Sequence, residues 1–464
     1  MPRSSEQMLR DARAIWQAGL DAVRSDRLVC DALQVVGQLL LVGDDEPIDL
    51  RSIERIEVVG AGKAGAGMSA GVLQALGPAL VEAKQLGGWV NVPADCVTDS
   101  TGPIHLHAAR PAGVNEPCAA GVVGAEEILR RVAVLGPNDL CVVLISGGGS
   151  ALLPAPIDGV TLEDKLAVTR VLSATGANIA ELNAVRKPLS RIKGGGLART
   201  CRAGRLVTLI ISDVLGDPLD VIGSGPTVPS LTTAGDALAV LRKYCPSRND
   251  VPAAVWQALE APSQPPSGKF PPDVRNIVIG NNAVAVDAAG LAAERLGYSH
   301  AMTSARESEG MAEEVGRRLA DMALHMRGTT GPDCLVSGGE PVVKLADLAV
   351  RGRGGRNQQL VLASLARLVE STAERGRAGQ GIVLLSAGTD GEDGPTDAAG
   401  AVLDEHCWPA AQALGLDLST FLQRNNAYTF WQAVGGLVKT GPTHTNVCDL
   451  RVLLVDRVEL GGRT

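Results

Sequence analysis

Apolar segments of strand length alternate with helical patterns along this chain. The strand-like segments are residues 56–60, 140–146, 206–212, 277–280, 334–337, 382–386 and 450–455. Continuous apolar strands separated by helices are typical of a sheet with helices on both faces, so the pattern predicts an α/β protein with a doubly wound, mainly parallel sheet. Residues 1–27 carry apolar positions at helical spacing among charged residues, which predicts an amphipathic helix.

Chain length and proline content predict two domains. A chain of 464 residues is too long for one hydrophobic core. Prolines are concentrated between residues 246 and 275, which indicates a connection between domains. We therefore expect a larger N-terminal domain at 1–245 and a smaller C-terminal α/β domain at 276–464.

Several expected strands end in small polar residues. These ends begin at Ser146, Ser212, Ser337 and Ser386. In open α/β sheets, ligands bind beyond the carboxyl ends of the strands. Because such ends occur on both sides of the proline-rich segment, we expect the active site in a cleft between the two domains.

Composition and charge narrow the range of partners. The net charge is −8 and only 2% of the residues are aromatic, so we expect no nucleic-acid partner. No apolar run is long enough to span a bilayer, and the charged N-terminus is unlike a signal peptide, so we expect a cytoplasmic protein with no membrane partner. The nine cysteines form no C-x-x-C pair, and the six histidines lack ligand spacing, which argues against a zinc site. The oligomeric state, a homo-oligomer included, is left open.

A glycine turn with a lysine inside it follows the first expected strand. Gly60, Gly62 and Gly65 match the G-x-G-x-x-G pattern, which by itself is weak evidence for a dinucleotide site. The next apolar stretch ends without the acidic residue that would bind a ribose. Lys63 would direct a cation at an anion held by this turn. A packing turn with a solvated lysine is the alternative.

A second glycine-rich turn follows the apolar segment that ends at residue 146. Successive glycines leave backbone N–H groups free to converge on phosphate oxygens, although the chain has no Walker A motif. A tight turn between strand and helix is an equal alternative. The residues of this turn are Ser146, Gly147, Gly148, Gly149 and Ser150.

Four cations lie close together in the next motif, beside a glycine run. They are Arg186, Lys187, Arg191 and Lys193. This density favours a polyphosphate ligand, and a solvated basic helix face is the alternative, above all for Arg191.

Carboxylates follow two other strand ends. Asp213 is placed as a Mg²⁺ ligand or as the base that accepts a substrate proton, whereas Asp217 is equally suited to capping a turn. In the second half of the chain, an arginine in a glycine-rich loop can bind a carboxylate or a phosphoryl group. The candidate residues there are Gly338, Glu340, Arg356, Asn357, Asp390 and Asp393.

Taken together, these motifs resemble the class II glycerate kinases, or glycerate 2-kinases. The matching blocks are residues 60–64, 146–152, 183–187, 193–196, 212–213, 223–226, 337–340, 354–358, 387–394 and 443–446. The match covers nearly the entire chain and is far more specific than any single glycine motif. The resemblance implies a Rossmann-like N-terminal domain and a C-terminal domain that contains a MOFRL region at about 332–450, with the active site in the cleft between them.

The resemblance also implies a reaction. ATP and Mg²⁺, or another divalent cation, would serve to phosphorylate D-glycerate to 2-phosphoglycerate. By position, Lys63 and Arg356 are the catalytic or substrate-anchoring cations, one holding the glycerate carboxylate and the other the γ-phosphoryl group. Asp213 would orient or deprotonate the 2-hydroxyl, and Asp213 and Asp390 would hold the metal. The nucleotide-binding residues would be Gly60, Gly62, Ser146, Gly147, Gly148, Gly149, Ser150, Arg186, Lys193, Gly338, Glu340 and Asn357.

Two other functions compete with this interpretation. The first glycine motif gives some support to an NAD(P)-dependent hydroxypyruvate reductase, although Lys63 and the missing ribose acid argue against it. The polar strand ends would also suit a non-catalytic phosphosugar-binding module. Such a module would have no function for the carboxylates of Asp213, Asp390 and Asp393.

Overall fold

The computed structural model describes residues 3–97, 102–114, 116–262, 268–371 and 378–457. The chain divides into two compact units. The central unit is Ser25–Gly280, and the terminal unit joins Met1–Arg24 to Asn281–Thr464. This division differs from the expected one, because the first helix belongs with the C-terminal part of the chain and residues 246–275 lie within the central unit.

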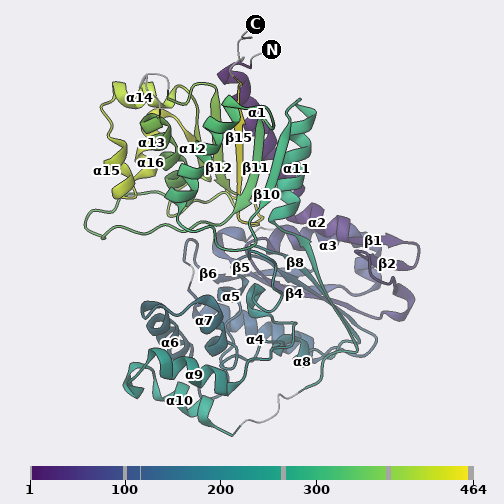
Figure 1. The fold of residues 1–464 in the computed structure, drawn as a ribbon. Helices are drawn as coiled ribbons and strands as arrows, with labels where there is room; N and C mark the ends of the chain where they lie inside the picture. Colours follow the sequence, from purple (N-terminus) through teal and green to yellow (C-terminus); the bar gives the residue numbers. More distant parts are fainter. Residues whose placement is uncertain (1–2, 98–101, 115, 263–267, 372–377, 458–464) are drawn as a thin grey trace. The chain divides into compact units, whose positions relative to one another are not determined.

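A six-stranded sheet forms the middle of the central unit, in the order β6-β5-β4-β7-β8-β9 (Figure 1). All neighbouring strands in it are parallel, which confirms the predicted doubly wound sheet. Its strands are β4 (Ile56–Ala61), β5 (Gly87–Pro93), β6 (Ile104–Arg110), β7 (Leu140–Ile145), β8 (Arg205–Ile211) and β9 (Asp273–Gly280). A small antiparallel sheet precedes it, made of β1 (Leu33–Val36), β2 (Leu39–Val42) and β3 (Ile48–Asp49).

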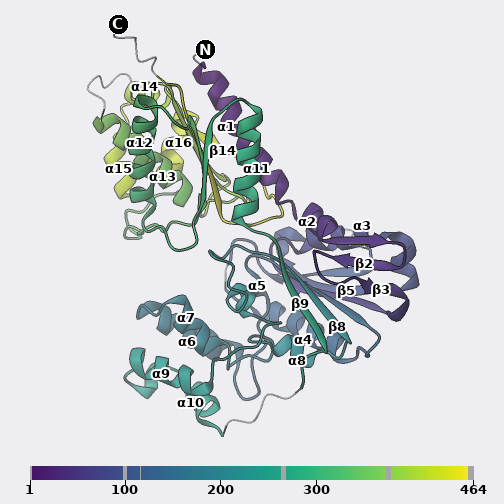
Figure 2. The same ribbon diagram turned by 45° about the vertical axis from the view of Figure 1, so that its right-hand side comes forward.

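Helices cover both faces of this parallel sheet (Figure 2). One face carries α2 (Ser25–Ala32) and α3 (Gly65–Ala83), and the other carries α4 (Ala119–Ala133), α5 (Gly149–Leu152) and α8 (Gly196–Thr200). Side chains of α4, α5 and α8 pack with those of β4 and β7 into one buried cluster. The alternation of strand and helix in the sequence therefore produces two covered faces, as expected of a doubly wound fold.

A group of helices with its own apolar core includes part of the proline-rich segment, so residues 246–262 are packed and are not a linker, whereas residues 263–267 lie outside the described residues. The group consists of α6 (Leu162–Ala174), α7 (Ile179–Arg186), α9 (Ala234–Tyr244) and α10 (Ala253–Glu260). Val255, Trp256 and Leu259 of α10 are buried in this core. Prolines at the ends of short helices are compatible with a packed segment, and here tertiary burial decides the structure.

The terminal unit contains a mixed sheet in the order β10-β11-β15-β12-β13-β14. Only β10 and β11 pair in parallel, because β15 runs antiparallel between β11 and β12. The strands are β10 (His300–Ser304), β11 (Cys334–Gly339), β12 (Ile382–Gly388), β13 (Gly400–Leu403), β14 (Leu437–Val438) and β15 (Asp449–Val455). The carboxyl ends of β11 and β12 therefore meet the amino end of β15 at one edge of the sheet.

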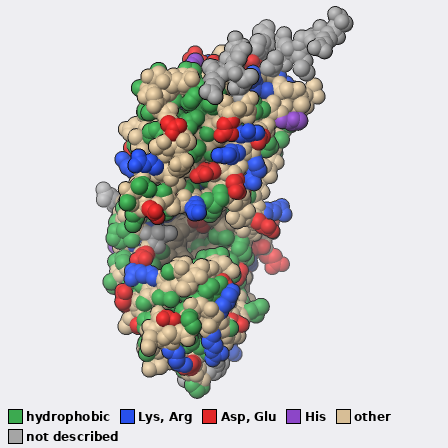
Figure 3. Space-filling view, turned by 60° about the vertical axis from the view of Figure 1, so that its left-hand side comes forward, with side chains coloured by type: hydrophobic (Ala, Val, Ile, Leu, Met, Phe, Trp, Pro, Cys, Tyr) green, Lys and Arg blue, Asp and Glu red, His purple; other side chains and the backbone are tan. Residues whose placement is uncertain are grey.

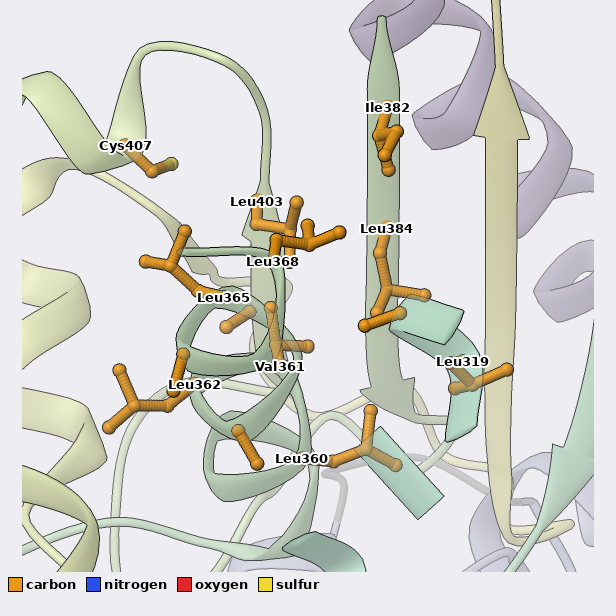
Figure 4. Packing of buried hydrophobic residues seen from close by; sticks show 14 of the residues in the cluster. Leu319, Leu360, Val361, Leu362, Leu365, Leu368, Ile382, Leu384, Leu403 and Cys407 are labelled. Atoms are coloured by element: carbon orange, nitrogen blue, oxygen red, sulfur yellow. The ribbon is translucent and has the colours of Figure 1, made fainter. Parts of the chain in front are cut away.

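Two helical layers enclose this mixed sheet (Figure 1). One layer consists of α1 (Ser5–Ala22) and α11 (Asn282–Arg295), so the predicted amphipathic N-terminal helix is present and buries Ile15 and Trp16. The other layer consists of α12 (Ala312–Gly328), α13 (Arg356–Ser371), α14 (Cys407–Ala413), α15 (Leu418–Gln423) and α16 (Ala427–Val434). Leucines of α13 face Ile382 and Leu384 of β12 in the core (Figure 4).

Charged side chains of both signs lie on the surface of the protein (Figure 3). On the face drawn in Figure 3, acidic and basic side chains are interspersed. Among the helices of the described segments, none combines the length and the apolar character needed to cross a membrane.

Candidate functional site

Two glycine-rich turns meet at the point where the strand order of the central sheet reverses. Residues 62–64 follow β4, and residues 146–148 follow β7, its neighbour in the sheet. In doubly wound sheets, the carboxyl edge at this reversal is where ligands bind. The two turns predicted from sequence as phosphate-binding loops are therefore adjacent.

Close backbone contacts hold these two turns together. The Ala64 N–H donates to the Ser146 hydroxyl at 3.1 Å, and the Lys63 N–H donates to the Gly147 carbonyl at 2.9 Å. Gly62 has a φ of +152°, and a Cβ at that position would lie 1.9 Å from the Ser146 hydroxyl oxygen. Ser146, expected to bind the nucleotide, is buried, and its hydroxyl accepts from the backbone of the first turn.

Lys63 and a second cation lie beside the glycine at the start of α5. A Cβ on Gly148 would lie 3.8 Å from Cγ of Lys63 and 3.3 Å from a terminal nitrogen of Arg110. Arg110 ends β6, and sequence analysis missed it because β6 was not among the expected strands. The sequence does contain a signal for Arg110, because a cation at the end of an apolar segment can lie at the carboxyl end of a strand.

Lys193 connects the second turn with a neighbouring loop. Its ammonium group donates to the Ser150 hydroxyl at 2.6 Å, to the Ser150 carbonyl at 3.0 Å and to the Ser224 hydroxyl at 3.3 Å. The two hydroxyl oxygens are 3.0 Å apart. Ser150 and Lys193, two of the expected nucleotide-binding residues, are thus in direct contact, and Ser224 joins them.

Burial and mutual repulsion destabilise the charged forms of the cations in this region. Burial, together with Lys165 and Arg186, lowers the pKa of Lys193 well below its usual value. Burial and the charge of Arg186 lower the pKa of Lys165 to about 7, and burial lowers the pKa of Arg186. A bound anion would relieve this repulsion, so the cluster of Lys165, Arg186 and Lys193 (the buried cation cluster) is suited to phosphate. Lys165 was missed because its helix, α6, has no motif.

Asp213 follows β8 at the same edge of the central sheet. It is half-buried, and the Ser212 hydroxyl accepts a hydrogen bond from the Val214 N–H at 3.2 Å in the turn that presents it. Asp217, three residues after Val214, has a φ of +53°. The expected carboxylate at the end of β8 is therefore on the edge that carries both glycine turns.

A second polar cluster (the strand-end cluster) lies in the terminal unit, where β11, β12 and β15 meet. Asp449, the first residue of β15, pairs with Gly339 of β11 and with Gly388 of β12. Gly338 packs against Asn282, whose amide group donates to the Asp449 carbonyl at 2.9 Å. Gly338, expected to contact the nucleotide, thus supports the backbone at this junction.

Arg356 begins α13 and is held in the strand-end cluster by two carboxylates. Its guanidinium donates to Asp449 at 2.8 and 3.0 Å and to Glu340 at 2.9 Å. Burial by itself lowers the pKa of Arg356, but the ion pairs outweigh it and raise the pKa above its usual value. Burial also raises the pKa of Glu340, against the opposing effect of Arg356. Asp449 was missed because it carries no motif and precedes the last apolar segment.

Buried hydrogen bonds fix the start of α13. Asp393 accepts from the N–H groups of Asn357 at 3.0 Å and Gln358 at 2.9 Å, which caps the helix. The Asn357 side chain donates to Asp449 at 2.9 Å and accepts from Ser386 at 2.5 Å. Burial raises the pKa of Asp393 to about 7, although the helix N–H groups favour its charged form. Asn357, expected to bind the cofactor, is buried and positions Arg356.

Asp390 lies in the acidic loop that follows β12. It is half-buried and accepts from the Glu392 N–H at 3.1 Å. Within the described segments, no group of three or more His, Cys, Asp or Glu side chains is arranged to hold a metal ion. Mg²⁺ in phosphoryl-transfer sites uses one or two carboxylates together with substrate phosphates, so Asp213 and Asp390 have the appropriate chemistry.

Comparison with known proteins gives consistent matches over most of the chain. A family model described as MOFRL family matches residues 333–449, and one described as a domain of unknown function (DUF4147) matches residues 11–260. The glycerate kinase of Homo sapiens is 36% identical, covering 97% of this chain and 94% of the relative. A putative hydroxypyruvate reductase of Agrobacterium vitis is 39% identical and covers 86% of this chain and 87% of the relative.

A solved structure is similar over the same extent. The crystal structure of glycerate kinase from Thermotoga maritima superposes with a TM-score of 0.80 at 32% identity and covers 97% of this chain and 100% of that one. The parallel sheet, with polar residues at the strand ends beside the reversal of its strand order, defines an α/β protein of the open, doubly wound class. The chain belongs to the MOFRL-containing glycerate kinase family, which confirms the resemblance found in the sequence.

Proposed function

We propose that this protein transfers the γ-phosphoryl group of ATP to the 2-hydroxyl of D-glycerate, forming 2-phosphoglycerate and ADP. The glycerate kinases among its relatives support the substrate. The observation that carries the proposal is the contact of Lys193, a member of the buried cation cluster, with the carbonyl and hydroxyl of Ser150. This contact places a cation against the glycine turn at the carboxyl edge of a doubly wound sheet, which favours a phosphate ligand.

The proposal assigns roles to charged residues that follow strands in the central unit and in the strand-end cluster. The 2-hydroxyl oxygen of glycerate forms a bond to the γ-phosphorus while the bond to the β-phosphate oxygen breaks, and Asp213 takes the hydroxyl proton. Lys63 and Arg356 divide the binding of the glycerate carboxylate and the γ-phosphoryl group between them. Mg²⁺, held by Asp213 and Asp390 with the phosphates, would neutralise phosphate charge.

A hydroxypyruvate reductase is the second candidate, since relatives from Agrobacterium vitis carry that name. The two activities can be separated by measuring ADP release from D-glycerate, ATP and Mg²⁺ alongside NADH consumption by hydroxypyruvate. We expect ADP release with D-glycerate and none above background with L-glycerate, and NMR of the product should show phosphate on the 2-hydroxyl. NADH consumption without ADP release would reject the kinase.

Variants then test the assigned cations. Because phosphoryl transfer depends on charge stabilisation, Lys63→Ala should lower kcat by more than about tenfold. Arg356→Lys should also lower kcat by more than about tenfold. Lysine is chosen because it keeps a cation beside the buried carboxylate of Asp449. Arg191→Gln is the matched control, since Arg191 is exposed and pairs with Glu126 on the surface. A loss of less than about tenfold in Lys63→Ala would remove Lys63 from the reaction.

A further inference from the structure

Ser224 has a backbone conformation that serine rarely adopts. It lies between Gly223 and Gly225, and the φ angles of the three residues are +59°, +65° and +61°. The two glycines adopt this left-handed conformation without strain, whereas the Cβ of a serine makes it unfavourable. Glycine would fit the backbone of this position better, so the serine points to a function of its side chain. The proposed reaction has so far given the motif at residues 223–226 no role.

The Ser224 hydroxyl is a buried junction between three other side chains. Ser224 is 1% exposed, and its hydroxyl accepts from the Lys193 ammonium group at 3.3 Å. It donates to Oδ1 of Asn183 at 3.4 Å and lies 3.0 Å from the hydroxyl of Ser150. These partners belong to the turn before α8, to α7 and to the second glycine-rich turn. One hydroxyl therefore joins four segments of the central unit.

Lys193 depends on this hydroxyl for the direction of its side chain. An ammonium group has three N–H donors. Here the acceptors are the Ser150 carbonyl, the Ser150 hydroxyl and the Ser224 hydroxyl. These three acceptors are uncharged, so their geometry sets where the ammonium group points. Because Ser150 supplies two of them, loss of the Ser224 hydroxyl would leave the ammonium group held by a single residue.

Backbone hydrogen bonds fix the left-handed turn against the glycine run that follows Lys193. The Gly194 N–H donates to the Ser224 carbonyl at 3.0 Å, and the Gly195 N–H donates to the Gly225 carbonyl at 2.7 Å. The conformation of Ser224 is thus determined by its neighbours, and it is this conformation that brings the hydroxyl to the ammonium group of Lys193.

We infer that Ser224 is a positioning residue for the nucleotide: its hydroxyl holds the Lys193 ammonium group against the second glycine-rich turn, where the ATP phosphates bind. The inference rests on the proposed function, since it takes ATP as the ligand of this turn. The strained backbone distinguishes this role from a purely structural one. Replacing the side chain by hydrogen removes the strain and the hydroxyl together, so ATP binding should weaken while the backbone is relieved.

Two substitutions at position 224 separate the hydroxyl from the strain. Ser224→Gly and Ser224→Ala both remove the hydroxyl, so each should weaken ATP binding by at least about tenfold, measured by calorimetry on the full-length protein with Mg²⁺. Only glycine relieves the strain, so Ser224→Gly should unfold at a higher temperature than Ser224→Ala. In turnover assays the KM for ATP should rise, and the KM for D-glycerate should stay within about twofold of wild type.

Gln85→Gly is the matched control. Gln85 is also a left-handed residue of the central unit, with a φ of +45°, but its side chain is exposed. This variant loses the strain without losing a buried hydroxyl, so its ATP affinity should stay within about twofold of wild type.

The outcomes separate this inference from the proposed function. Wild-type affinity for ATP in Ser224→Gly, with or without a loss in Ser224→Ala, would overturn the inference and leave the kinase activity standing. Wild-type protein that binds ATP but releases no ADP with D-glycerate would reject the proposed function, and the affinities of the two variants would still decide the role of Ser224. Wild-type protein that does not bind ATP would overturn both.

Discussion

Lys165 and Lys193 are buried in the central unit near the half-buried Arg186, and the repulsion that the two lysines experience has a measurable consequence. The lowered pKa values of Lys165, Arg186 and Lys193 mean that each loses its proton more readily than a solvated side chain. A polyphosphate bound among them would reverse the shift, since an opposite charge favours the charged form. Binding and protonation are therefore linked at this site.

The first prediction concerns proton uptake by Lys165. Its pKa of about 7 in the free protein should rise when ATP binds, so ATP binding should take up protons at neutral pH, and affinity should fall as the pH rises above about 7. Calorimetry in buffers of different ionisation enthalpy measures this uptake. We expect Lys165→Met to reduce it, and Lys243→Met, which changes an exposed lysine, to leave it unchanged. Unchanged uptake in Lys165→Met would contradict the role of the cluster.

The second prediction concerns Gly62. An added Cβ would clash with the hydroxyl and backbone of Ser146, so Gly62→Ala should force the two turns apart. The free energy of unfolding should fall by about 1–3 kcal/mol, measured by denaturant titration. Gly136→Ala is the control, because the nearest atom to its added Cβ is 3.7 Å away. A stability equal to wild type would show that the turns can separate without cost.

At the scale of single elements, the start of α13 is fixed by a buried cap. Asp393 is 2% exposed and bonds the first N–H groups of the helix. Arg356 is the first residue of that helix, so the cap also sets where its guanidinium begins. The position of the proposed catalytic arginine therefore depends on a residue with no expected catalytic role.

The third prediction compares this cap with an exposed one. Asp393→Ala should lower the free energy of unfolding by about 2–4 kcal/mol, because it leaves buried N–H groups unpaired. Asp417→Ala, which removes the cap of α15 at the surface, should cost about 1 kcal/mol. Thermal unfolding followed by circular dichroism measures both. The two variants losing the same stability would argue that burial adds nothing to the Asp393 cap.

At the scale of the whole molecule, the first helix and the last strands of the chain belong to the same unit. The N-terminal helix α1 packs on β12 and β15, which follow it by more than three hundred residues, and both belong to the terminal unit (Figure 1). The central unit is thus inserted into the sequence of the terminal unit. A substitution that destabilises α1 should therefore also destabilise β12 and β15.

The fourth prediction uses Ile15, which is fully buried in α1. Ile15→Ala should destabilise its surroundings by about 2–5 kcal/mol through the cavity that it leaves. Amide hydrogen exchange should then rise in peptides from β12, β15 and α11, and stay unchanged in β4 and β7. Arg10→Ala, at an exposed position of the same helix, is the control. Faster exchange in β4 and β7 alone would contradict the assignment of α1 to the terminal unit.

Local sequence was sufficient for seven of the twelve strands in the two six-stranded sheets and for the motifs at their ends. The apolar segment at residues 140–146 became β7, and the glycine turns with Lys63 and Ser150 lie at the edge where the fold class predicted a site. A period of apolar residues and a glycine turn are local properties, so they can be read without knowing the fold. The same motifs indicated the family.

Partners distant in sequence could not be read in this way. Asp449 pairs with Arg356 from a position 93 residues later in the chain, and Lys165 of α6 lowers the pKa of Lys193, which lies in a turn before α8. Neither residue stands in a motif, so only the fold reveals them. The prediction of a connection between domains at the proline-rich segment was also made from local residues. Prolines indicate breaks in secondary structure, but they do not show that Trp256 is buried against α9.

The sequence by itself determined the α/β class, the family and the residues at the strand ends, because these depend on patterns within a few residues of one another. Only the tertiary structure decided that α1 closes the terminal sheet, that Ser146 and Asn357 position their neighbours, and that the Ser224 hydroxyl meets Lys193. Each of these features depends on contacts between side chains that are distant in the sequence. Such contacts are determined by tertiary packing and not by local sequence patterns.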